Sequence, residues 1–346
     1  MNDCYPISKD ISIKISNLSF VCACLVVSIH LVHPTGGRSA FLDKMLAGGI
    51  SLIAVPCYFC ISGYLIAPKI MLGAWRTEVR KRFHTLLVPF LLWGLIALLS
   101  SFPISILNDI QLRQTVGTTF CQTHDLTKTL VSWLGLDLTE MPLSGPLWYL
   151  RNLLFFVLCS QGICWCVNKW QWYWVGSLFL LTLGWNFTQT AFPKSVNGFL
   201  LYGFSLFGLM CFSLGMLLRL NCYNLLNWKP SFFLLPIGIA LWGISAFLHT
   251  IPCYRSFFIL FFLYVIWQMM PERPFPKLLL QSTFSIYLMH SIFLGYLQSF
   301  PRHIPQPTTV VGFLLHWLAP ILLSIGASFI LHRFLPRFSS LIFGGR

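Results

Sequence analysis

The stretch ISNLSFVCACLVVSIHLVH at residues 15–33 decides the fold, because it is predominantly apolar and carries no lysine, arginine, aspartate or glutamate. A helix of about twenty such residues is long enough to cross the hydrocarbon core of a bilayer. Comparable stretches recur along the chain. They predict an all-α fold, a polytopic membrane helix bundle of about ten transmembrane helices, at residues 15–33, 46–67, 83–102, 147–167, 172–189, 198–218, 231–250, 256–270, 278–298 and 311–332.

The composition also favours a membrane protein. Of 346 residues, 56% are hydrophobic and 9% are charged, which is too apolar for an ordinary soluble domain. We expect one integral-membrane domain over residues 1–346, with no fused soluble domain. The formal charge of +14 would suit a nucleic-acid-binding protein, but no basic face with interleaved aromatic residues occurs, so no nucleic-acid partner is expected. Most of the 12 cysteines lie inside apolar stretches and are expected to be small buried residues, and no metal site is predicted.

The distribution of charge predicts the orientation. If the N-terminus is cytoplasmic, about two thirds of the 23 basic residues fall on the cytoplasmic side, in agreement with the positive-inside rule. We therefore expect both termini to be cytoplasmic. The longest connection, at 103–146, would then lie outside, either as a cover over an acceptor or as a plain surface loop.

Two histidines near the end of the first predicted span are candidates for chemistry. His30 and His33 are three residues apart, so on a helix they share a face. An ionisable side chain is costly in lipid and is expected to face protein or a cavity. A neutral imidazole there can act as a general base toward a hydroxyl. The alternative is a histidine that only forms a hydrogen bond to a neighbouring helix.

A basic segment leads into the third predicted span. It reads Arg76-Thr-Glu-Val-Arg80-Lys81-Arg82-Phe-His84. These cations could bind the phosphates of a charged donor. The alternative is an anchor that follows the positive-inside rule and needs no ligand.

Polar residues in three further spans could complete a site. Ser62 precedes Gly63 at the end of the second span, where small residues favour close helix packing; a hydroxyl that contacts substrate is the second interpretation. Tyr287 and His290 are three apart in the ninth span and form either part of a polar pocket or a buried hydrogen-bonded pair.

The start of the fourth span carries a further polar group. Trp148 and Tyr149 are typical of the membrane interface, and Arg151 and Asn152 follow one turn deeper. The arginine either extends its charged group toward the interface or faces the bundle with the asparagine, where both could hold an acceptor.

The order of these motifs resembles acyltransferase family 3, the multi-span bacterial O-acyltransferases that act on cell-surface sugars. The resemblance covers about residues 15–335. It rests on the first span that ends at His30, on FCISGYL at 59–65, on KRF at 81–83 with PF at 89–90, on PLWYLRNL at 146–153, and on FSIYLMH at 284–290.

The resemblance implies an acyl donor, usually acetyl-CoA, that acts as a co-substrate from the cytoplasm with no other bound cofactor. It implies that a first-span histidine is needed for transfer, which corresponds to His30. The first arginine of the family's pair corresponds to Arg82, whereas Thr85 stands where the second is expected, so Arg80 or His84 would have to compensate.

The function predicted is an integral-membrane O-acyltransferase, an O-acetyltransferase of polysaccharide biosynthesis in the bacterial inner (plasma) membrane. Its partners would be acyl-CoA, a cell-envelope glycan or lipid-linked sugar as acceptor, and membrane lipids, with a homo-oligomer left open. Direct transfer and an acyl-enzyme intermediate are both compatible with the residues. The alternative function is a transporter or flippase of lipid-linked sugars, for which paired half-repeats with broken helices would be typical.

Overall fold

The computed structural model describes residues 7–31, 39–47, 49–112, 115, 117–123, 125–134, 136, 142–191, 205–221, 225, 236–241, 244, 252–299 and 309–345. Over these residues the secondary structure is helical and contains no strand, which confirms the predicted all-α class for this part of the chain. The cysteines whose side chains the structure describes are free: Cys22, Cys24, Cys57, Cys60, Cys121, Cys159, Cys164, Cys166 and Cys211.

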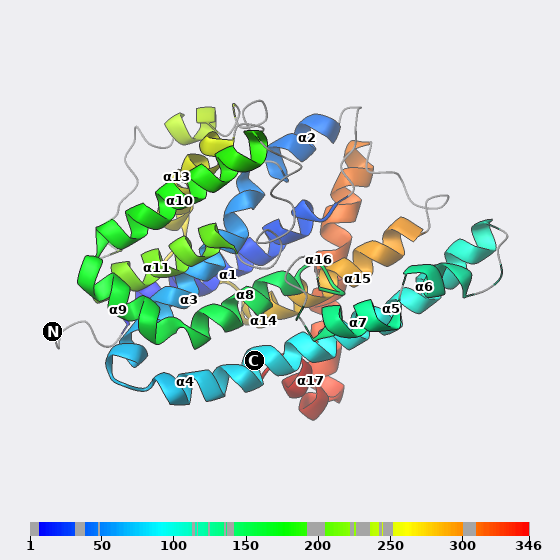
Figure 1. The fold of residues 1–346 in the computed structure, drawn as a ribbon. Coiled ribbons are helices and arrows are strands. Elements are labelled where there is room, and N and C mark those ends of the chain that lie inside the picture. Colours follow the sequence, from blue (N-terminus) through cyan, green and yellow to red (C-terminus); the bar gives the residue numbers. More distant parts are fainter. Residues whose placement is uncertain are drawn as a thin grey trace.

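The helices pack as a bundle (Figure 1). In this bundle α3 packs against α1 and α11, while α10 packs against α11 and α13, and α15 packs against α1 and α16. The elements are α1 (Lys9–Ile29), α2 (Ser39–Leu46), η1 (Ile50–Ile53), α3 (Ala54–Met71), α4 (Trp75–Arg82), η2 (Phe83–Leu87), α5 (Val88–Leu112), α6 (Thr118–Thr123), α7 (Leu126–Trp133), α8 (Leu147–Leu158), α9 (Ser160–Trp170), α10 (Trp172–Ala191), α11 (Leu206–Leu220), α13 (Pro252–Met269), α14 (Lys277–Gln281), α15 (Thr283–Ser299), α16 (Val310–Phe334) and α17 (Pro336–Ile342).

The predicted count of ten spans is not confirmed. By length and composition, four helices of the described residues can cross a membrane: Lys9–Ile29, Asp43–Met71, Trp75–Ile106 and Val310–Phe334. A fifth is possible if the bent pair α8–α9 counts as one span. Helices α11 and α15 have 15 and 17 residues, shorter than the roughly twenty that a straight span needs. Most of the predicted span at 231–250 lies outside the described residues.

Helix α1 begins and ends earlier than the apolar pattern predicts. Its N-cap is Ser8, whose side-chain oxygen accepts a hydrogen bond from the backbone N–H of Ile11 at 3.3 Å. At the other end His30 is the C-cap, so the helix does not continue to residue 33. Capping chemistry therefore sets the start of this helix, and hydropathy alone does not.

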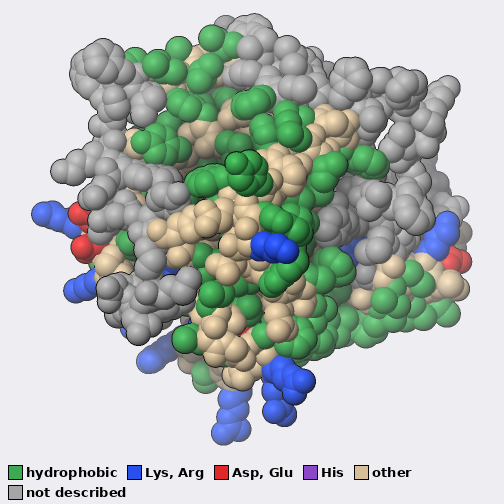
Figure 2. Space-filling view, turned by 60° about the vertical axis from the view of Figure 1, so that its left-hand side comes forward, with side chains coloured by type: hydrophobic (Ala, Val, Ile, Leu, Met, Phe, Trp, Pro, Cys, Tyr) green, Lys and Arg blue, Asp and Glu red, His purple; other side chains and the backbone are tan. Residues whose placement is uncertain are grey.

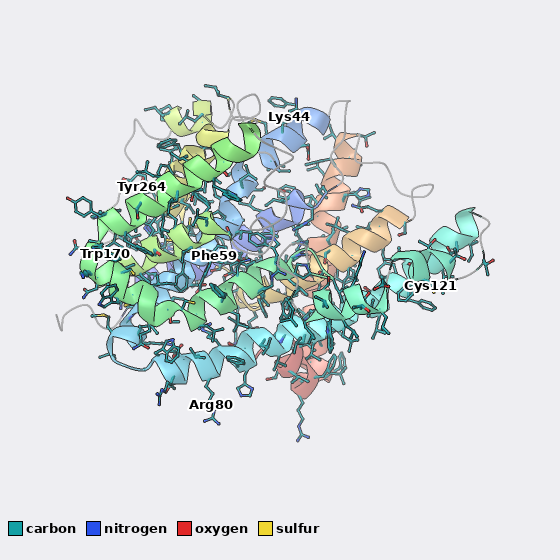
Figure 3. All side chains as sticks on the ribbon, in the orientation of Figure 1. Lys44, Phe59, Arg80, Cys121, Trp170 and Tyr264 are labelled. Carbon is teal, nitrogen blue, oxygen red and sulfur yellow. The ribbon has the colours of Figure 1, made fainter. Side chains whose placement is uncertain are left out.

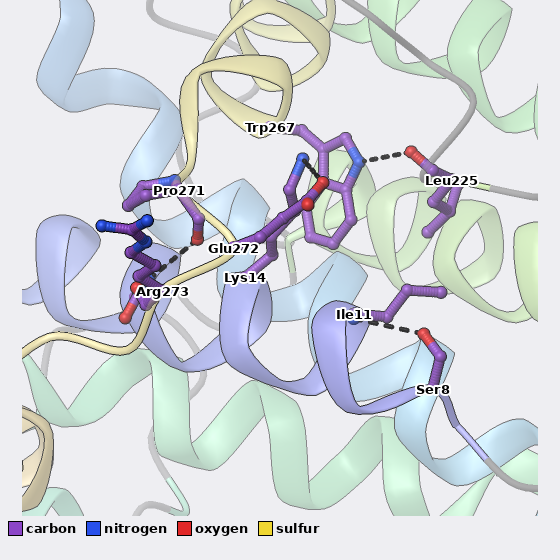
Figure 4. A network of polar contacts seen from close by, with 9 residues as sticks. Ser8, Ile11, Lys14, Leu225, Trp267, Pro271, Glu272 and Arg273 are labelled. Carbon is purple, nitrogen blue, oxygen red and sulfur yellow. Dashed lines mark hydrogen bonds and ion pairs between the residues drawn. The ribbon is translucent and has the colours of Figure 1, made fainter.

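The first turns of α1 are tied to the connection between α13 and α14 (Figure 4). The buried amide of Asn17 donates to the carbonyls of Pro271 and Arg273 at 3.0 and 2.8 Å, and its oxygen accepts from the N–H of Phe275 at 3.0 Å. Lys14 lies 3.7 Å from the carboxylate of Glu272. One asparagine thus satisfies three backbone groups that secondary structure leaves open.

Two glycines allow α3 and α11 to pack closely. A Cβ atom at Gly63 would lie 2.0 Å from the carbonyl oxygen of Phe212, and one at Gly215 would lie 1.9 Å from that of Cys60. The predicted packing role of Gly63 is therefore confirmed. These contacts bring the two backbones together without intervening side chains, as small residues do in membrane helix pairs.

The predicted fourth span is not one straight helix. Helices α8 and α9 meet at Cys159 with a bend of 68°. The indole N–H of Trp75, at the start of α4, donates to the carbonyl of Leu158 at 3.2 Å, so the break in the helix is capped by a side chain from another element.

Helix α5 is longer than its predicted span and reaches Leu112. Beyond its apolar part, the carboxylate of Asp109 accepts hydrogen bonds from the backbone N–H groups of Gly117 and Thr119 at 2.7 and 3.0 Å, and also from the Thr119 hydroxyl. These bonds, led by that of the hydroxyl, lower the pKa of Asp109 below its ordinary value. The start of the predicted outer loop is therefore ordered by one buried carboxylate.

Candidate functional site

A polar cavity of about 350 Å³ lies between α1, α3, α8 and the α14–α15 segment, beside the junction of α4 with η2. Its polar lining comes from Ser16, Ser19, Tyr58, Ser62, Arg82, Tyr149, Gln281, Thr283 and Tyr287. The cavity thus joins residues from all five of the sequence motifs described above.

Of the four predicted donor-binding residues, the structure brings only Arg82 to this cavity. Its Nε atom is buried and has no hydrogen-bond partner in the described part of the chain. Arg76, Arg80 and His84 are exposed on the outer side of α4 and η2, and Figure 3 shows Arg80 pointing away from the bundle. The donor roles predicted for these three residues remain predictions.

Arg82 is positioned by α4, and an ion pair attaches this short helix to α3. The ammonium group of Lys69 lies 2.8 Å from the buried carboxylate of Glu78. Arg82 follows Glu78 by one turn, at the C-terminal end of the helix. Figure 1 shows the α3–α4 turn on the same side as the start of α1 and the α9–α10 turn, and these segments carry Lys9, Lys69, Arg76 and Lys169. In Figure 2, where this side faces the reader, most lysine and arginine side chains project from the lower edge of the molecule. We call this side the basic end of the bundle.

Three tyrosines form a layer at one end of the cavity. The ring of Tyr149 lies 5.7 Å from those of Tyr58 and Tyr287, and the last two are 6.3 Å apart. Tyr58 donates to the carbonyl of Ser19 at 2.6 Å, while the hydroxyl of Tyr149 lies 3.4 Å from that of Ser62. We call these rings the tyrosine layer.

Two histidines pack together beyond the tyrosine layer. The rings of His30 and His290 are 5.1 Å apart, centroid to centroid, at 41°. The Nδ1 atom of His290 is 2.9 Å from the carbonyl of Ile286. Because a carbonyl only accepts, Nδ1 carries the proton and Nε2 presents a lone pair. That Nε2 atom is buried and, among the described residues, has no hydrogen-bond partner.

A short connection before α8 supports the histidine pair. A Cβ atom on Gly145 would touch the His30 ring at 3.7 Å, so this glycine forms one wall beside the imidazole. Tyr287 donates a hydrogen bond to the carbonyl of the next residue, Pro146, and the hydroxyls of Ser144 and Ser291 are 3.2 Å apart. The connection is thus held on α15 from both sides.

The histidine pair and the cavity are neighbours along α15. Tyr287 lines the cavity, and its ring centroid is 6.5 Å from that of His290, one turn further along the helix. His30 does not line the cavity as the structure has it. Tyr287 of the tyrosine layer therefore connects the lining of the cavity to the histidine pair.

The remaining predicted residues differ in their positions. Asn152 is buried, donates to the carbonyl of Trp148 at 3.0 Å and accepts from the N–H of Ser205 at 2.9 Å, so it ties α8 to the start of α11. Trp148 packs against the ring of Phe59. Arg151 is partly buried on α8. His33 lies outside the described residues.

Sequence reasoning missed two contributors to the site. Tyr58 belongs to the tyrosine layer and stands four residues before Ser62, so helical periodicity places both on one face of α3 and could have found it. Gly145 contacts His30 from a position 115 residues away. No local pattern could have indicated that contact.

A larger cavity of about 430 Å³ lies between α1, α3, α10, α11 and α13. Its lining is almost entirely apolar, with Tyr64 and Tyr264 among the few polar side chains. Within the described residues, no group of three or more His, Cys, Asp or Glu side chains could hold a metal ion. The smaller, polar cavity is therefore the better candidate for chemistry.

The arrangement suits the transfer of a group from an anionic donor. The partly buried guanidinium of Arg82 lines the cavity, and the two imidazoles lie next to Tyr287, which lines it as well. A cation can bind phosphate, and an imidazole can take a proton from a hydroxyl at neutral pH.

Comparison with known proteins identifies the family. The family described as "Acyltransferase domain" matches residues 14–333. Succinoglycan biosynthesis protein ExoH of Rhizobium meliloti (strain 1021) is 27% identical over 172 residues, which cover 46% of this chain and 44% of that protein. The chain thus matches less than half the length of this curated relative. No solved structure matches the chain. Since the family match extends over most of the sequence, in agreement with the ordered motifs, the chain belongs to acyltransferase family 3.

Proposed function

We propose that this protein is an integral-membrane O-acyltransferase that moves an acetyl group from acetyl-CoA to a hydroxyl of a cell-envelope glycan or lipid-linked sugar. The family match supports acyl transfer, and the relative's role in succinoglycan biosynthesis supports a polysaccharide acceptor. The membrane would be the bacterial inner membrane, with the basic end of the bundle on the cytoplasmic side, in agreement with the positive-inside rule.

In this proposal the donor enters from the basic end. Its phosphates bind near Arg82, which is partly buried and whose Nε atom has no hydrogen-bond partner among the described residues. Its pantetheine arm follows the cavity toward the tyrosine layer. Between Ser19, which lines the cavity, and His30 the rise along α1 is about 16 Å, so an extended arm rather than a compact headgroup must cover the distance.

The chemical step takes place beside the histidine pair. His30 accepts the proton of the acceptor hydroxyl, whose oxygen forms a bond with the thioester carbonyl carbon. The carbon–sulfur bond then breaks, and the CoA sulfur leaves and takes up a proton. His290 carries its proton on Nδ1, so its Nε2 atom can accept a hydrogen bond from an N–H group of His30. Such a bond would favour one tautomer of His30.

One observation carries the proposal. Residues from opposite parts of the chain, His30 at the C-cap of α1 and His290 in α15, place two imidazoles against each other next to a cavity that Arg82 lines. Lipid packing alone gives no reason to bury such groups together, because ionisable residues are costly in a membrane.

The test uses the purified protein in lipid nanodiscs with labelled acetyl-CoA and an envelope polysaccharide extract. General-base catalysis contributes about 10²- to 10⁴-fold, so His30→Ala should lower kcat by that factor. Charged hydrogen bonds contribute about 1.5–3 kcal/mol, so Arg82→Ala should raise the KM for acetyl-CoA by about 10- to 100-fold.

Two matched variants control for general damage. Arg80→Ala removes the same charge from an exposed position on the same helix and should change KM less. His316→Ala removes a buried histidine of α16 that also places Nδ1 on the carbonyl four residues earlier, at 2.8 Å. Acyl turnover that survives both His30→Ala and Arg82→Ala would refute the assigned roles. Sugar movement without acyl turnover would instead favour a transporter.

A further inference from the structure

The last described helix, α17, returns to the start of α5. The indole N–H of Trp93 donates to the carbonyl of Ile342 at 2.9 Å. The ring of Phe343 stacks on Trp93 at 6.0 Å and on His332 at 5.6 Å, and the side chain of Phe343 is 1% exposed. These contacts hold the 343–345 turn against Trp93, near the start of α5.

The 343–345 turn touches the backbone of the preceding π-helical turn, η2. A Cβ atom at Gly344 would lie 2.6 Å from the carbonyl oxygen of Thr85 and 3.0 Å from its Cα. Gly344 also has a φ of +65°, which L side chains rarely adopt. The backbone of Gly344 therefore packs directly on the backbone of Thr85, and no side chain lies between them that could move aside if either segment shifted.

The segment that Gly344 contacts also carries the end of the polar cavity. Arg82 directly precedes η2, and Leu86 lies within it; both side chains line the cavity. A π-helical turn is an uncommon local structure that often marks a functional site, and its hydrogen bonds do not continue those of the α-helices beside it. An external contact is therefore well placed to set its position.

We propose that the docked 343–345 turn is a positioning element for the donor: by packing on Thr85 it holds η2 so that the Arg82 guanidinium faces the cavity. Donor affinity then depends on a segment that touches neither the cavity nor the histidine pair. This inference rests on the proposed donor site, since it assigns the turn a role in binding the phosphates of acetyl-CoA.

The chain offers a matched pair of glycines for the test. Gly344 and Gly345 both have positive φ, +65° and +75°, so alanine strains the backbone at either position. Only at Gly344 does the added Cβ meet Thr85, whereas at Gly345 its nearest neighbour is the Ser340 hydroxyl at 4.0 Å. Gly344→Ala should raise the KM for acetyl-CoA about fivefold or more with kcat within about twofold, and Gly345→Ala should leave both unchanged.

A second pair loosens the turn without adding any atom. Trp93→Phe removes the N–H that bonds to Ile342 and keeps a ring for Phe343 to stack on. Trp133→Phe removes an equivalent N–H, which donates to the carbonyl of Leu91 elsewhere on α5 at 2.8 Å. Trp93→Phe should raise the KM for acetyl-CoA and Trp133→Phe should not. If Gly344→Ala fails to fold, this pair decides the question.

Hydrogen exchange of the η2 amides, measured with and without acetyl-CoA, distinguishes the positioning role of the 343–345 turn from the donor site at Arg82. Faster exchange in Gly344→Ala together with a raised KM supports the positioning role. Equal KM values for Gly344→Ala and Gly345→Ala, or for Trp93→Phe and Trp133→Phe, would overturn it. If Arg82→Ala leaves KM unchanged, the donor site itself is misplaced, and the proposed function fails at that point independently of the turn.

Discussion

Replacing Gly63 with alanine should separate α3 from α11 and destabilise the bundle. The new Cβ atom would lie 2.0 Å from the carbonyl oxygen of Phe212, and ordinary contact starts at 3.4 Å, so the backbones must separate by about 1.4 Å at this point. Because the obstacle is backbone, no side-chain rotation can relieve it.

Two opposing effects decide the magnitude. Alanine in a helix is more stable than glycine by about 0.5–1 kcal/mol. Overpacking a well-packed interface costs about 1–3 kcal/mol, and a backbone obstacle places this site at the upper end. We therefore expect a net destabilisation of about 2 kcal/mol. The adjacent Ser62 hydroxyl, 3.4 Å from that of Tyr149, should move with the helix and lower acyl transfer as well.

The assay is reversible unfolding of the purified protein in mixed detergent micelles, with Gly162→Ala as the control. Gly162 is a helical glycine of α9 with no atom within 4 Å of an added Cβ, so alanine should there be neutral or stabilising. Gly215→Ala should resemble Gly63→Ala. The double variant should be destabilised by less than the sum, because one separation relieves both clashes. If Gly63→Ala matched Gly162→Ala in stability, the close packing of α3 and α11 would be wrong.

Three further outcomes follow from single polar side chains. Asn17→Ala removes three hydrogen bonds to the 271–275 connection and should lower the free energy of unfolding by about 2 kcal/mol or more, with faster amide exchange in that connection. Asn152→Ala leaves the Ser205 N–H without its acceptor and should lower the free energy of unfolding by about 1 kcal/mol, measured by the same unfolding assay, with acetyl-CoA binding retained. The pKa of Asp109 is lowered in the folded protein, so its contribution is present above the unfolded value of 3.8 and disappears as the pH falls through the lower folded value. The protection factors of the Gly117 and Thr119 amides against exchange should therefore fall only in that acidic range, and Asp109→Asn should lower these protection factors at higher pH as well.

Sequence reasoning could locate most helices and the order of the motifs. Apolar stretches of the right length placed α10 and α16 within two residues at each end, because a helix in lipid needs a long apolar surface. They also located α1, α3 and α5, but the predicted ends differ from the observed ones by four to ten residues. The local sequence predicts helix caps and helix breaks less well. The bend at Cys159 is capped by Trp75 from another helix, so the residues near position 159 gave no indication of it.

The sequence by itself determined that this chain is an all-α membrane protein of acyltransferase family 3 with a histidine near the end of its first long apolar stretch. The tertiary structure alone decided which polar residues meet: that Arg82 and not Arg80 lines the cavity, that His30 packs against His290, and that Asn152 holds α11 rather than facing the cavity. The physical reason is that lipid is as apolar as a protein core. A membrane helix is therefore hydrophobic on both its lipid-facing and its buried side, so hydropathy shows where a helix runs but not which of its faces is turned toward its neighbours.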